Sequence, residues 1–178
     1  MTQLVLEREF DPPMAGRDVI DMAKSCAWCF EQHSVRWLGS MLAVDGRSMV
    51  CRFESSDAES IRQALRKLNT DTRMLWPGTV HQAQEPVQPN VIVERSFDEP
   101  VVLEELQAKE DAKRWCLDTY QVRFVRTLLS SDRKRMLCLY SGPDAEAVRA
   151  SQRKAEMPVD RVWSFVELAW PTSSPEPA

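Results

Sequence analysis

The sequence predicts an α+β fold built from two tandem ferredoxin-like βαββαβ units, packed sheet to sheet as one pseudo-twofold dimeric α/β-barrel. The first observation is a repeat: residues 4–10 (LVLEREF) return as residues 91–97 (VIVERSF), and the two halves align without a gap at an offset of 94 − 7 = 87 residues. The second is that both halves show the same order of expected elements. Because the two helices of such a unit cover one face of its sheet, a second unit in the same chain can cover the other.

The first half begins with a strand, a helix and a hairpin. Residues 4–10 form a short apolar run that ends at Asp11-Pro12-Pro13, where proline removes a backbone donor and restricts the residue before it. Residues 16–33 carry apolar side chains at three- and four-residue spacing, which predicts an amphipathic helix. Strands are expected at 35–44 and 48–54, because the Asp-Gly between them is a strong hairpin signal.

A second helix and a last strand complete this half. Ser56 and Glu59 form a capping-box pattern, which predicts that a helix begins there. The last strand is expected around residues 74–81, where Pro77-Gly78 predicts an edge position or a bulge.

The second half follows the same plan, which sets the predicted domain boundaries. We expect repeat 1 at 1–81, a linker at 82–90, repeat 2 at 91–168, and a disordered tail at 169–178, whose composition is rich in proline and serine. Within repeat 2 the expected elements are a strand at 91–97, a helix at 102–120, strands at 122–130 and 135–141, a helix at 144–156 and a strand at 160–168.

Charge and hydropathy exclude two classes of partner. Lysine and arginine number 23 against 27 acidic residues, a net charge of −4, which argues against a nucleic-acid-binding protein. The basic run Arg133-Lys134-Arg135 is expected in a solvated turn. No apolar run approaches the ~18 residues that a membrane helix needs, and the N-terminus lacks the layout of a signal peptide. We therefore expect a cytoplasmic protein without a membrane partner, as a monomer or homodimer.

The cysteines are interpreted as small buried apolar residues. Four of the five fall at repeat-related, apolar-patterned positions, so disulfide pairing is not expected. Cys26 and Cys29 form a C-x-x-C, but it lies inside an expected helix and its first cysteine is matched by Lys113 in the other half. A metal or redox role for this pair is therefore not predicted.

Several motifs resemble one known family. They are Val-Glu-Arg-x-Phe at 93–97, Val-x-Trp-x-x-Ser at 35–40, a Cys-x-Tyr or Cys-x-Phe strand before an Asp-Ala-Glu helix start, and Pro-Val-Asp-Arg-Val at 158–162. In this order they resemble the small nickel-binding-protein-like family of domains of unknown function, present here as two tandem copies. The resemblance implies a ferredoxin-like dimeric α+β barrel, and it implies that at least one member binds nickel.

The chain departs from that family where a metal would bind. In the family form Val-x-Trp-x-His-Ser-Tyr, the histidine position is Gly39 in the first half and Arg126 in the second. Nickel favours imidazole, thiolate and carboxylate ligands, whereas a guanidinium repels a cation. We therefore predict no metal site and no cofactor, with nickel implied only by the resemblance. The remaining histidines, expected to be surface or capping residues, are His33 and His81.

Arg126 is the centre of the predicted binding site. Strict strand alternation puts Val35, Trp37, Gly39 and Met41 on one face, and Val122, Phe124, Arg126 and Leu128 on its counterpart. A charged group among apolar neighbours needs a partner, and the first-strand glutamates Glu7 and Glu94 are the natural candidates. The predicted ligand-binding residues are Arg126, Glu7, Glu94, Trp37, Phe124, Met41 and Tyr140.

Three interpretations of this site stay open. Arg126 and a glutamate can form a structural salt bridge, or Arg126 can hold an acidic or aromatic small molecule between the sheets, with apolar walls around it. A glutamate can instead act as a general base in a cofactor-independent cyclase, oxygenase or isomerase, an argument by analogy of fold. The sequence favours a small-ligand-binding protein, in which duplication left one half free to diverge. Whether it is also an enzyme stays open, and so does the alternative of a nickel or transition-metal-binding protein that uses new ligands such as Glu7, Glu94 and cysteines.

Overall fold

A computed structural model describes residues 2–67, 69–71, 74–83 and 87–169. The chain divides into two compact units, 1–75 with 167–178, and 76–166. The predicted disordered tail falls, apart from Ala169, outside the described residues, as do three residues of the predicted linker. None of the helices in the described part of the chain has the length and apolarity needed to span a lipid bilayer.

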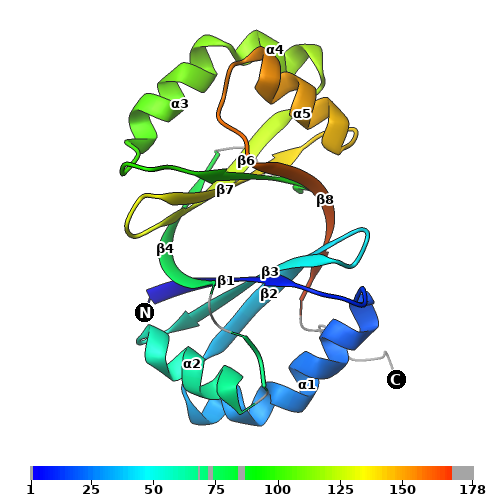
Figure 1. Cartoon of the computed structure of the whole chain (residues 1–178), viewed down its shortest axis with the longest axis vertical. Helices are drawn as coiled ribbons and strands as arrows, with labels where there is room; N and C mark the ends of the chain where they lie inside the picture. Colours follow the sequence, from blue (N-terminus) through cyan, green and yellow to red (C-terminus); the bar gives the residue numbers. More distant parts are fainter. Residues whose placement is uncertain (1, 68, 72–73, 84–86, 170–178) are drawn as a thin grey trace, which may run out of the picture. The chain divides into compact units, whose positions relative to one another are not determined.

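The first unit is a sheet with two helices on one of its faces (Figure 1). Strand β1 pairs antiparallel with β3, and β3 pairs antiparallel with β2, which forms the predicted hairpin with it. The elements are β1 (Thr2–Glu9), α1 (Gly16–Gln32), β2 (Arg36–Ala43), β3 (Ser48–Ser55) and α2 (Ala58–Arg66). Every one of them lies within a few residues of its predicted position.

The start of α2 differs from the predicted capping box. Asp57, and not Ser56, is the N-cap, and its carboxylate accepts a 2.8 Å hydrogen bond from the backbone amide of Ser60. This bond, with those from Ser56 and Ser60 hydroxyls, lowers the pKa of Asp57. The cap is one residue later than predicted, since the Asp57 carboxylate accepts from a free amide of the first turn with a full negative charge, which the start of a helix favours.

The core of the first unit lies between the sheet and α1 and α2. Its buried members come from alternate positions of the strands and from the apolar stripes of the helices. They include Leu4, Leu6, Val19, Ala23, Cys26, Phe30, Trp37, Met49, Cys51, Phe53, Ile61, Ala64 and Leu65. The five cysteines of the chain are all free and buried, as predicted.

The second unit has the same plan with a longer sheet, and its helices lie on one sheet face (Figure 1). Its strands follow the order β8-β5-β7-β6-β4. The elements are β4 (Leu75–Gln82), β5 (Val91–Ser96), α3 (Leu103–Ala112), α4 (Arg114–Thr119), β6 (Arg123–Ser130), β7 (Arg135–Ser141), α5 (Ala145–Lys154) and β8 (Arg161–Leu168).

Two features of this unit differ from the sequence prediction. The single helix expected at 102–120 is interrupted at Lys113, whose backbone leaves the helical region at φ −115° and ψ 24°. The predicted boundary at residue 81 also differs from the division of the chain at 75/76. The reason is that β4 pairs antiparallel with β6, Gly78 opposite Ser130 and Gln82 opposite Arg126, so most of β4 groups with the second unit.

Candidate functional site

The predicted row of site residues on β2 is broken by a β-bulge. Trp37 lies opposite Phe53, but Gly39 lies opposite Arg52, so one extra residue, Leu38, interrupts the alternation. Trp37 therefore packs in the core beneath the helices, whereas Met41, opposite Val50, lies on the other sheet face. Gly39 takes a left-handed φ of +127°, and a Cβ there would lie 3.0 Å from the carbonyl oxygen of Leu168.

The same irregularity recurs on β6. Phe124 lies opposite Tyr140, and Arg126 lies opposite Leu139, with a register shift between them. Phe124 and Tyr140 pack edge to face beneath the helices, with ring centroids 5.8 Å apart. Arg126 lies on the opposite sheet face with Leu139, because directly paired residues share a face. The expectation that Trp37, Phe124 and Tyr140 share a face with Arg126 and Met41 is therefore wrong.

Glu94, a predicted partner of Arg126, is held by other residues. Its carboxylate accepts hydrogen bonds from Trp163 Nε1 at 2.6 Å and from Arg135 Nη2 at 2.8 Å, and Arg161 Nη1 lies 3.7 Å away. Glu7 lies on β1 opposite Val50. The Nε of Arg126 is buried, and none of the described residues accepts a hydrogen bond from it. A binding role for Arg126, Met41, Glu7 and Glu94 stays a prediction.

The residues at the family's metal position do not fit nickel. Arg126 places a guanidinium there in one half, and Gly39 in the other half has no side chain that could bind a metal. Within the described residues, no group of three or more histidine, cysteine, aspartate or glutamate side chains could hold a metal ion. His81 Nε2 lies 2.8 Å from Thr79 Oγ1, and His33 caps α1.

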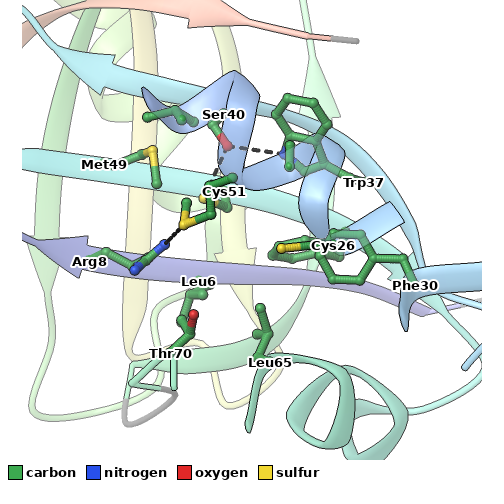
Figure 2. A pocket seen from close by; sticks show the side chains of 14 residues that line it. Leu6, Arg8, Cys26, Phe30, Trp37, Ser40, Met49, Cys51, Leu65 and Thr70 are labelled. Carbon is green, nitrogen blue, oxygen red and sulfur yellow. Dashed lines mark hydrogen bonds between the residues drawn. The ribbon is translucent and has the colours of Figure 1, made fainter. Parts of the chain in front are cut away.

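A pocket lies in the first unit, between its sheet and its helices (Figure 2). The cavity has a volume of about 30 Å³. Its walls are mostly apolar and rich in sulfur, and β1, α1, β2, β3 and the region of α2 all contribute. The lining residues are Leu6, Arg8, Val19, Met22, Ala23, Cys26, Phe30, Trp37, Ser40, Met49, Cys51, Phe53, Leu65 and Thr70.

Arg8 is the charged group of this pocket. Figure 2 shows its side chain pointing from β1 into the pocket, with Cys51 and Met49 on the neighbouring strand. Its Nη1 donates to Met22 Sδ at 3.7 Å, a weak acceptor, and its guanidinium lies 4.8 Å from the centroid of the Phe10 ring. Neither contact supplies a negative charge, so the guanidinium can accept an anion.

A buried hydrogen-bond chain forms another wall of the pocket. Trp37 Nε1 donates to Ser40 Oγ at 3.0 Å, and Ser40 Oγ donates to Cys51 Sγ at 3.0 Å. Burial raises the pKa of the Cys51 thiol to about 11, and the hydrogen bond from Ser40 offsets this only in part. Cys51 is therefore a neutral thiol near neutral pH, not a nucleophilic thiolate.

The second unit has a buried polar network at the corresponding place. Arg95, matching Arg8 at the 87-residue offset, is 1% exposed, and its Nη2 donates to Tyr140 Oη at 3.0 Å and to Gln152 Oε1 at 2.8 Å. Tyr140 Oη donates to Glu110 Oε1 at 2.6 Å. Burial, followed by the Glu110 charge, raises the pKa of Tyr140 well above its ordinary value, so the phenol remains a donor.

Sequence reasoning missed both the pocket and the network. Arg8 and Arg95 belong to the repeated Glu-Arg-x-Phe motif, and alternation places them on the face that the helices cover. The available signal was a set of differences between the halves at positions near these arginines. The first half has Ala23, Phe53 and Leu65 where the second half has Glu110, Tyr140 and Gln152. This signal becomes visible when the positions that differ between the halves are compared around an arginine that both halves share.

Comparison with solved structures supports the predicted fold class over nearly the whole chain. A mutant chlorite dismutase from Candidatus Nitrospira defluvii is 12% identical, covering 94% of this chain and 90% of its own, with a TM-score of 0.50. A candidate chlorite dismutase, TA0507, is 11% identical, covering 93% of this chain and 94% of its own, with a TM-score of 0.51. The chain thus has the α+β fold of tandem ferredoxin-like units, in the dimeric α+β-barrel class.

Comparisons of sequence give one family. A search of curated proteins finds no match to this chain. The profile described as nickel responsive protein SCO4226-like matches residues 92–164, which lie within the predicted second repeat. Residues 92–164 therefore match the nickel-responsive SCO4226-like family, and the resemblance seen in the sequence motifs is confirmed for this part of the chain.

Proposed function

We propose that this protein binds a small molecule in the pocket of its first unit, between the sheet and α1. The observation that supports this most directly is Arg8, a charged side chain that enters a largely apolar cavity where its contacts are a thioether and an aromatic ring. Ligand sites in proteins commonly combine apolar walls with a few polar groups that orient the ligand. The pocket has this composition.

The lining of the pocket favours binding over proton-transfer chemistry. Among the described lining residues there is no histidine, aspartate or glutamate to act as a general base. The Cys51 thiol, with its pKa raised to about 11, is a poor nucleophile at neutral pH. No observation at this site favours the enzyme alternative, so binding is the function that we propose.

The volume of the cavity limits the ligand to a small one. A cavity needs a volume of roughly 10–15 Å³, measured in the same way, to hold one water molecule. At about 30 Å³, the cavity has room for a molecule of only a few heavy atoms unless its walls move. The proposal therefore departs from the expectation of an aromatic ligand, and it places the site beneath the helices.

Filling the cavity should weaken the binding of any small ligand there. Ala23 lines the pocket from α1, so Ala23→Leu puts a larger apolar side chain into the space that the ligand would occupy. We expect a loss of affinity of about tenfold or more for probes found by ligand-observed NMR among neutral and charged molecules of a few heavy atoms.

Ala27→Leu is the matched control, since Ala27 lies on the same helix but does not line the pocket. It should leave binding unchanged. Equal affinity of all three proteins for every probe would contradict the proposal, as would the absence of any bound probe. Circular dichroism spectra confirm that each variant is folded before the comparison is made.

A further inference from the structure

The two arginines of the repeated motif occupy equivalent places in their sheets. Arg8 lies opposite Met49 on β3, and Arg95 lies opposite Met136 on β7. All four residues follow the same offset, since 8 + 87 = 95 and 49 + 87 = 136. The side chains around the two arginines can therefore be compared position by position.

The second unit surrounds its arginine with polar groups from three elements. Tyr140 on β7 and Gln152 on α5 accept hydrogen bonds from Arg95, and Glu110 on α3 accepts from Tyr140 and, at 3.3 Å, from Gln152 Nε2. The carboxylate, the hydroxyl and the amide are all buried. This unit thus carries its own anion, Glu110, which is linked to the buried arginine through Tyr140 and Gln152.

The first unit lacks all three of these groups. The residues at the matching positions are Ala23, Phe53 and Leu65, since 110 − 87 = 23, 140 − 87 = 53 and 152 − 87 = 65. All three line the pocket that Arg8 enters. At these matched positions the first unit therefore keeps the cation and lacks the anion, and Ala23 has a smaller side chain than the glutamate at the matching position of the second unit.

We infer that the ligand of this pocket is a small monocarboxylate, whose carboxylate supplies beside Arg8 the negative charge that Glu110 supplies to the Arg95 network through Tyr140 and Gln152. This inference rests on the proposed function and names the class of its ligand. An arginine binds a carboxylate through paired, charge-assisted hydrogen bonds, and a cation or a neutral ligand gains no such contact. The thioethers and aromatic rings of the lining accept the short alkyl part of the ligand.

Carboxylates and amides of nearly the same shape test whether the negative charge of the ligand determines binding. Acetate and propionate should bind at least about tenfold more tightly than acetamide and propionamide, measured by calorimetry or by NMR titration. Arg8→Gln should remove this preference, because glutamine keeps hydrogen-bond donors and loses the charge. Arg17→Gln, a change at an exposed position of α1 whose side chain is 86% accessible, should leave the preference intact.

A second variant tests the inferred mimicry directly. The triple change Ala23→Glu, Phe53→Tyr and Leu65→Gln installs the second unit's polar set beside Arg8, so acetate binding should fall at least about tenfold. The unfolding midpoint should stay at or above that of the unchanged protein, which shows that binding is lost by occupation and not by unfolding. Ala27→Glu, on the same helix outside the pocket, should bind acetate normally.

The outcomes distinguish the two proposals. If neutral probes bind as well as carboxylates and Ala23→Leu blocks both, the pocket binds ligands but the inferred class is wrong. If carboxylates bind and the triple variant binds them equally well, the inferred mimicry is wrong. If no probe binds the unchanged protein, the proposed function fails together with the inference.

Discussion

Glu110→Ala should lower the free energy of unfolding by about 3–5 kcal/mol, because it leaves buried charge and buried donors without their acceptor. Arg95 is 1% exposed, and it lies in the network that the Glu110 carboxylate completes through Tyr140 and Gln152. After the change, the Tyr140 hydroxyl and one Gln152 amide hydrogen lose their acceptor in an interior without access to water. Urea unfolding followed by circular dichroism measures the loss.

Glu105→Ala is the control for this prediction, because Glu105 lies on the same helix and is exposed. It should change stability by no more than about 0.5 kcal/mol. A second comparison uses Glu110→Ala combined with Arg95→Met, which removes the buried charge along with its partner and should recover part of the loss. A loss below about 1 kcal/mol for Glu110→Ala alone would show that the network contributes little.

Gly46→Ala should cost about 2–3 kcal/mol of stability, because this glycine has both a left-handed backbone and no space for a side chain. Its φ is +72°, and a Cβ there would lie 2.5 Å from the carbonyl oxygen of Met14 and 3.1 Å from its amide nitrogen. The Gly46 carbonyl also accepts a 2.9 Å hydrogen bond from that amide. Any shift of the turn to relieve the overlap would weaken this bond.

Arg133 provides the matched position for this test, since 46 + 87 = 133. It adopts φ +60° with a side chain already in place, so Arg133→Ala keeps the conformation and should cost less than about 0.5 kcal/mol. Denaturant unfolding of both variants gives the comparison. Equal losses at the two positions would show that the close approach to Met14 does not determine stability.

The strands and helices were predictable because their signals are local. Proline and Asp-Gly end elements, and helical spacing identifies α1 from the order of residues alone. The interruption at Lys113 was not predictable, because the apolar spacing continues across it. The bulges on β2 and β6 were missed for a related reason, since alternation assumes a regular strand; the isolated Gly39 was the one available sign.

The candidate site was harder to predict, because it depends on which face of the sheet each side chain occupies. One extra residue at Leu38 moves Trp37 to the helix side while Met41 lies on the other face. The sequence does direct attention to differences between the halves, and our proposal for Arg8 rests on differences of this kind. In our proposal the informative differences lie among the neighbours of a retained residue, whereas the sequence prediction centres on the unmatched Arg126.

The Arg95 network has a consequence for how the two units respond to their surroundings. Its carboxylate is tethered to the chain, so its effective concentration beside the arginine is fixed whatever the solution contains. On our proposal, the site at Arg8 fills only in proportion to the free carboxylate, and binding then stabilises the folded first unit by mass action. The stability of the first unit would thus depend on the concentration of a small carboxylate, whereas the stability of the second unit would not.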